Sequence, residues 1–168
     1  MRILFITSTR VGDAILSTGL LSKLIADNPE AKITIACGPA AAPLFEAVPN
    51  LERIIVLNKM IFSLHWIAMW WDAVGKFWDV LVDLRNSPMS VPLAAAKRFR
   101  FVRKRDPEHR VLQLAAVMGL SEEPPTPSIW FSPQARATAK ALIPNGGPVL
   151  AVVRADSYAE GVQMIRDN

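Results

Sequence analysis

The sequence predicts an α/β fold with a mostly parallel sheet and helices on both of its faces. Short apolar runs, typical of buried parallel strands, recur along the chain. Segments with apolar residues at helical spacing separate most of these runs. Glycine, proline and asparagine stand at the boundaries, where they end helices and form turns. Strands that alternate with helices imply right-handed crossovers between parallel neighbours.

The first predicted strand is the apolar run at residues 2–7, which ends before Gly12. An apolar helical stripe over residues 14–26 follows, and Asn28-Pro29 stops that helix. The other predicted strands are 32–37, 53–57, 78–84, 99–102 and 148–153. The other predicted helices are 40–47, 61–76, 90–97, 107–120, 136–142 and 158–165. Residues 122–133 hold four prolines and are expected to form a loop or linker.

Composition sets the broad class of the protein. The chain has 168 residues, a net charge of +4 and one cysteine, Cys37, so no disulfide can form within it. No apolar run is long enough for a membrane-spanning helix, and we expect a cytoplasmic protein. His65 and His109 lack Cys or carboxylate neighbours at metal-ligand spacing. We therefore expect no metal and no cofactor.

The turn after the first strand, Arg10-Val11-Gly12-Asp13, is the first candidate for a site. Ligands of open α/β sheets bind outside the carboxyl ends of the strands, and Gly12 permits a tight turn or a close backbone approach. The turn matches neither the dinucleotide fingerprint nor the P-loop. Asp13 is therefore either an N-cap or first-turn acid of the helix, or a general base in a cleft.

Five segments resemble glycosyltransferase family 9, which includes the ADP-heptose:lipopolysaccharide heptosyltransferases. In chain order they are MRILFITSTRVGDAILSTGLLSKL, ITIACGP, FEAVPNLERII, WDVLVDLRNS and HRVLQLAAVMGL. Together with their spacing, they extend the resemblance over about residues 1–150. It implies a Rossmann-like domain that forms the N-terminal, acceptor-side half of a GT-B architecture.

The resemblance also implies an activity. Members of the family are inverting, metal-independent transferases, and Asp13 would be the general base. It would deprotonate an acceptor hydroxyl, which then attacks the anomeric carbon of ADP-heptose. The expected acceptor is the lipopolysaccharide inner core, whose carboxylates and phosphates suit arginine.

Six cations, interleaved with Phe99, Phe101 and Val102, crowd into residues 97–105. A solvated strand edge and a surface for an anionic glycolipid are both open interpretations, whereas no nucleic-acid-binding module accompanies the cluster. The predicted substrate-binding residues are Arg10, Gly12, Arg85, Arg98, Arg100, Arg103 and Arg105.

The aromatic segment at residues 61–78 holds four of the five tryptophans of the chain, two phenylalanines and His65. It is expected either to pack into the core or to contact the inner membrane peripherally.

The tail departs from the family. Residues 148–168 resemble a segment of the aldehyde dehydrogenase superfamily, of the methylmalonate-semialdehyde type, but without its nucleophile or a cofactor motif. The expected domains are an acceptor-side domain at 1–150 and an atypical tail at 151–168, with the C-terminal donor domain absent. A truncated or chimeric product, a genuine short protein and a coincidental tail are the alternatives. The chain alone is then expected to be inactive, a non-catalytic glycolipid-binding domain or a nonfunctional fragment.

Overall fold

The computed structural model describes residues 1–57, 73–102 and 109–143. The chain divides into two compact units, Met1–Ser132 and Pro133–Asn168. In the second unit the described residues form helix α4 (Pro133–Leu142), which buries none of its side chains. The domain boundary predicted at residue 150 lies outside the described residues and stays a prediction, as do the strand at 148–153, the helix at 158–165 and the tail.

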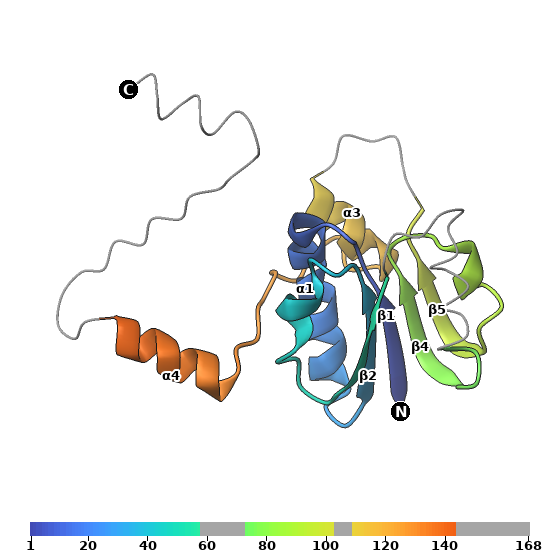
Figure 1. Cartoon of the computed structure of the whole chain (residues 1–168). Coiled ribbons are helices and arrows are strands. Elements are labelled where there is room, and N and C mark those ends of the chain that lie inside the picture. The colour runs from blue at the N-terminus through green and yellow to red at the C-terminus, as the bar shows by residue number, and fades with distance from the viewer. Residues whose placement is uncertain (58–72, 103–108, 144–168) are drawn as a thin grey trace, which may run out of the picture. The chain divides into compact units, whose positions relative to one another are not determined.

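The first unit is built on a five-stranded sheet (Figure 1). All four strand pairs are parallel, and the spatial order is β3-β2-β1-β4-β5. The strands are β1 (Arg2–Ile6), β2 (Lys32–Cys37), β3 (Leu51–Val56), β4 (Trp78–Asp83) and β5 (Ala95–Arg100). The Rossmann-like α/β fold predicted from the sequence is thereby confirmed.

Strand β1 is the centre of the core because both of its faces are covered. Ile3 and Phe5 belong to a cluster with apolar residues of helices α1 (Val11–Asp27) and α3 (Arg110–Val117). Leu4 and Ile6 point to the opposite face. There they pack in a second cluster with Ala73, Trp78 and Leu93, among others. Alternating side chains that are apolar on both faces are what a buried parallel strand requires.

The strand order reverses beside β1. The chain adds β2 and β3 on one side of β1, and then returns to add β4 and β5 on the other. The loops after β1 and β4 therefore diverge from neighbouring strand ends. Ligands of open α/β sheets bind at such a point.

One predicted helix is wrong. Residues 90–97 were expected to be helical because they are rich in alanine and other small residues. They instead end the short 3₁₀ helix η3 (Pro88–Ser90) and enter β5, which pairs with β4 from Ala95 onward. Parallel pairing with a buried strand outweighs the helix propensity of this alanine-rich stretch. Likewise, the helix expected at 40–47 is reduced to the 3₁₀ helix η1 (Ala42–Phe45).

The proline-rich stretch before Pro133 packs on α1. A Cβ added to Gly19 would lie 2.3 Å from the carbonyl oxygen of Pro125, so the chain crosses the helix at a position that only glycine allows. The backbone N–H of Ser128 donates to Thr18 Oγ1 at 2.9 Å, and Trp130 packs against the core. The stretch is a packed loop of the first unit.

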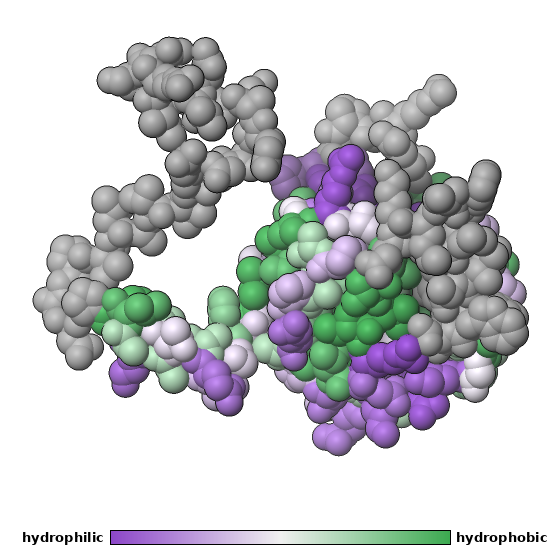
Figure 2. All heavy atoms as spheres, in the orientation of Figure 1, coloured by the Kyte–Doolittle hydropathy of each residue, from purple (hydrophilic) through white to green (hydrophobic). Residues whose placement is uncertain are grey.

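The aromatic segment is described only at its end. Trp78 is fully buried and donates from Nε1 to the Ala73 carbonyl at 3.2 Å, which confirms core packing for this residue. Phe77 beside it is 59% exposed. Figure 2 shows hydrophobic and hydrophilic side chains mixed on the visible surface of the first unit. None of the described helices is both long and apolar enough to cross a bilayer. The predicted membrane contact of residues 61–78 stays a prediction, since residues 61–72 lie outside the described part of the chain.

Candidate functional site

A cavity of about 1200 Å³ opens at the carboxyl ends of β1 and β4. Its walls come from the turn after β1, the first turns of α1, the corner after β4, Phe101, and α3. All of these elements belong to the first unit. The cavity therefore lies where the strand order reverses, which is where the topology predicts a ligand.

Asp13 lines this cavity from the first turn of α1. The N-cap of that helix is Arg10, which makes no side-chain capping hydrogen bond, so Asp13 is not the cap. The side chain of Asp13 remains 38% exposed. It is thus a first-turn acid that the helix dipole favours as a carboxylate and that a ligand in the cavity can reach.

Arg10 and Arg85 also line the cavity. An Arg85 guanidinium N–H donates to Thr9 Oγ1 at 3.0 Å, which joins the corner after β4 to the turn after β1. That turn packs tightly on Gly38, where an added Cβ would lie 2.6 Å from the Cα of Thr9. Gly38 thus sets the position of the turn, and Arg85 ties the two walls together.

Gly12 belongs to the start of a helix and does not form a tight turn. It lies inside the first turn of α1, and it is not among the described glycines with positive φ. An added Cβ would meet no atom within 4 Å. The predicted tight turn is therefore wrong, whereas a close approach to a ligand stays a prediction.

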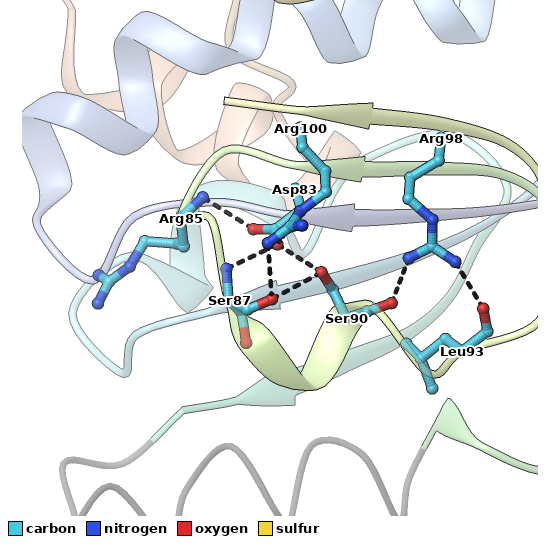
Figure 3. A network of polar contacts seen from close by, with 7 residues as sticks. All are labelled: Asp83, Arg85, Ser87, Ser90, Leu93, Arg98 and Arg100. Atoms are coloured by element: carbon cyan, nitrogen blue, oxygen red, sulfur yellow. Dashed lines mark hydrogen bonds and ion pairs between the residues drawn. The ribbon is translucent and has the colours of Figure 1, made fainter. Parts of the chain in front are cut away.

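The corner after β4 is organised by Asp83, whose side chain is fully buried (Figure 3). Its Oδ1 accepts from the backbone N–H of Arg85 at 2.9 Å. Its Oδ2 accepts from the backbone N–H of Ser87 at 2.7 Å and from the Ser90 hydroxyl at 2.6 Å. The Nε of Arg100 lies 3.9 Å from the same oxygen. These contacts neutralise the buried carboxylate and fix the backbone that carries Arg85 and Asn86.

The structure does not bring Arg98 and Arg100 to the cavity lining. Arg98 donates to the carbonyl oxygens of Ser90 and Leu93, and Arg100 donates to that of Ser87 at 3.4 Å (Figure 3). Both arginines thus hold the segment between β4 and β5. Arg103 and Arg105 lie outside the described residues.

Sequence reasoning missed Arg110, the first residue of α3. Its Nε lies 3.8 Å from Asp13 Oδ1, and its guanidinium carbon lies 4.5 Å from the centre of the Phe101 ring. Phe101, which follows β5, and Gln113, which belongs to α3, complete this wall of the cavity. Only the packing of α3 beside α1 reveals the contact, because nothing local in the sequence marks Arg110.

Charge in the cavity is unbalanced. Its lining contains three arginines, at positions 10, 85 and 110, and one carboxylate, that of Asp13. Guanidinium groups bind carboxylates and phosphates through paired hydrogen bonds. The arrangement therefore suits an anionic ligand that carries a proton for Asp13 to accept.

Metal and thiol chemistry have no candidate in the part of the chain that the structure describes. No group of three or more His, Cys, Asp or Glu side chains gathers there. Cys37 is buried at the end of β2, and desolvation raises the pKa of its thiol to about 11. A neutral buried thiol is a packing group and a poor nucleophile.

Comparison with known proteins gives a match in structure but not in sequence. No model of a known protein family matches the chain, and no curated protein matches it. A glycosyl transferase family 9 protein from Veillonella parvula has a similar structure, with a TM-score of 0.62 and 19% identity over 83% of this chain. The E. coli heptosyltransferase WaaC with ADP-2-deoxy-2-fluoro heptose gives 0.56 and 14% over 76%. WaaC with ADP gives 0.57 and 14% over 86%.

The chain spans about half the length of these structures, from 47% to 55%. At such low identities the likeness establishes a shared fold. Function belongs to the site that a fold carries and has to be argued from it. No comparison supports the predicted aldehyde dehydrogenase resemblance of the tail. The chain therefore has the fold seen in half of a glycosyltransferase of this type.

Proposed function

We propose that this chain is the acceptor-side domain of an inverting glycosyltransferase of the heptosyltransferase type. The observation that carries the proposal is the position of Asp13, an accessible carboxylate in a cavity rich in arginine at the reversal of the strand order. The fold shared with a family 9 transferase and with WaaC supports it.

In the proposed reaction Asp13 takes the proton of an acceptor hydroxyl. The acceptor oxygen attacks the anomeric carbon of the heptose from the face opposite the leaving group. The bond from that carbon to the diphosphate breaks, ADP leaves with the electron pair, and the configuration inverts. The half-exposed carboxylate of Asp13 meets the first requirement of such a base, which is access to the hydroxyl.

Arg10 and Arg85 would hold the acceptor. The lipopolysaccharide inner core carries anionic groups, and these two arginines line the cavity that contains Asp13, one after β1 and one after β4. The donor would be ADP-heptose, in keeping with the ligands named for the WaaC structures. We place this reaction at the cytoplasmic face of the inner membrane, where a lipid-linked acceptor is accessible.

The test is transfer of heptose from ADP-heptose to heptose-deficient lipopolysaccharide by the full chain. Asp13→Asn preserves size and removes the base, and it should lower the rate about 10²- to 10⁴-fold. Arg2→Gln is the matched control, because Arg2 forms a surface ion pair with Glu52 at 3.8 Å and does not line the cavity. Measurable transfer by the wild type that Asp13→Asn does not lower would refute the role of Asp13.

A second candidate is an acceptor-binding domain without turnover, and the excess of arginine in the cavity favours it. It predicts saturable, salt-sensitive binding of heptose-deficient lipopolysaccharide and no transfer. Arg10→Gln together with Arg85→Gln should weaken this binding at least about tenfold, since hydrogen bonds to charged groups are strong. Binding that this double substitution leaves unchanged would contradict both candidates.

A further inference from the structure

Arg110 stands between two fixed groups on the wall of the cavity. Its Nε faces Asp13 Oδ1 at 3.8 Å, and its guanidinium lies over the Phe101 ring at 4.5 Å. Arg110 also donates from Nη1 to Gln113 Oε1, one turn further along α3, at 3.2 Å. The guanidinium thus has contacts with Asp13, Phe101 and Gln113.

The dipole of the helix that carries Arg110 does not favour its charge. Arg110 is the first residue of α3, where the helix dipole disfavours a cation. Its charge is compensated by Asp13 of α1 and by the face of Phe101, both outside α3. Its placement therefore serves the cavity and not the helix.

Phe101 is the rigid end of this arrangement. Its side chain is only 9% exposed and belongs to the core cluster, and its backbone N–H donates to the Asp83 carbonyl at 2.8 Å. The chain of contacts thus runs from the core through the ring and the guanidinium to the carboxylate of Asp13. Among the described residues, Arg110 is the charged partner of that carboxylate.

We propose that Arg110 is a positioning residue, which holds the Asp13 carboxylate toward the cavity while Phe101 holds Arg110. The inference rests on the proposed function of Asp13 as the base. At 3.8 Å the contact is an ion pair and not a hydrogen bond, so it orients the carboxylate without occupying a lone pair that the acceptor hydroxyl needs. Loss of the ion pair should therefore lower kcat more than it changes KM.

The kinetic test uses the full chain in the heptose-transfer assay. Arg110→Gln should lower kcat about tenfold or more, with the KM for heptose-deficient lipopolysaccharide changed less than about twofold. Arg110→Lys keeps the charge but loses the planar stacking on Phe101, so it should restore part of kcat. Arg2→Gln breaks an ion pair of the same length at the first residue of β1, outside the cavity lining, and should change neither constant. If Asp13→Asn abolishes transfer while Arg110→Gln retains the wild-type kcat, the inference fails and the proposed function stands.

A second measurement does not depend on turnover. In ¹⁵N-labelled protein, exchange of the Arg110 Nε–H proton with water should become at least about threefold faster in Asp13→Asn and in Phe101→Leu, and stay unchanged in Arg2→Gln. Faster exchange in both variants, with no transfer by the wild type, would favour the acceptor-binding domain without turnover over the transferase and leave the positioning role of Arg110 standing. Unchanged exchange in both variants would overturn the inference whatever the activity.

Discussion

Two aspartates at the same edge of one sheet have opposite surroundings. Asp83, the last residue of β4, is fully buried and accepts three hydrogen bonds, whereas Asp13 is 38% exposed and has one ion pair at 3.8 Å. A buried carboxylate whose two oxygens both accept hydrogen bonds from the protein holds structure, and one whose oxygens stay exposed can accept a proton. The same difference separates Arg98 and Arg100, which bind backbone carbonyls, from Arg10 and Arg85, which line the cavity. Position relative to the strand ends, and not the local density of charge, distinguishes the two groups.

The largest effect on stability should come from Asp83→Asn. Both carboxylate oxygens accept hydrogen bonds, so the amide would place an NH₂ donor against other donors and leave Arg100 without its counter-charge. We expect a loss of about 2–4 kcal/mol in the free energy of unfolding. Urea unfolding followed by circular dichroism measures it, and a loss below about 1 kcal/mol would mean that the network is not structural.

Gly38→Ala should come next, because it tests whether the turn that carries Arg10 is fixed by packing. The new Cβ would lie 2.6 Å from the Cα of Thr9, and we expect a loss of about 1–3 kcal/mol. Gly12→Ala is the matched control, since it meets open space within a helix and should raise stability by up to about 1 kcal/mol. Thermal melts of the two variants should shift in opposite directions, and a common direction would contradict the packing argument.

Arg98→Gln should have a smaller effect of about 1 kcal/mol, because it removes hydrogen bonds to two carbonyl oxygens at the half-buried edge of the sheet. The affinity of Arg98→Gln for heptose-deficient lipopolysaccharide should equal that of the wild type.

Arg10→Gln should show the reverse pattern, with an unchanged free energy of unfolding and weaker binding of this acceptor. Titration of each variant with this acceptor separates the two groups, and weaker binding by Arg98→Gln would restore the substrate contact predicted from the sequence.

The effect of Asp13→Asn on stability should also be small. An exposed ion pair and a first-turn acid contribute about 0.5 kcal/mol or less each. The variant should therefore unfold at nearly the urea concentration of the wild type while losing transfer. A drop as large as that of Asp83→Asn would show that Asp13 holds structure and would remove the contrast between the two aspartates.

The fold could be predicted from the sequence because its central elements carry local signals. Ile3 to Ile6 form an unbroken apolar run, and the stripe of α1 is read from the spacing of its leucines. Strand β5 could be predicted only in part, by the strand expected at 99–102, because Ala95 to Lys97 look helical and their place in the strand comes from pairing with β4. The position of Asp13 in a cavity was predictable from the strand-to-helix turn. Its neighbour Arg110 was not, because their contact depends on how two helices distant in sequence pack together.

The crossing of α1 by the proline-rich loop bears on the order of folding. The hydrogen bond from Ser128 to Thr18 joins residues 110 positions apart, and closing so long a loop costs more entropy than pairing neighbouring elements. The loop should therefore dock after β1, α1 and β2 have formed. A side chain introduced at Gly19 would press against the Pro125 carbonyl. It should then raise the rate of unfolding while the folding rate stays nearly constant. The packing of the loop on α1 would thus form last in folding and break first in unfolding. The loop would control the lifetime of the folded unit and not the speed of its formation.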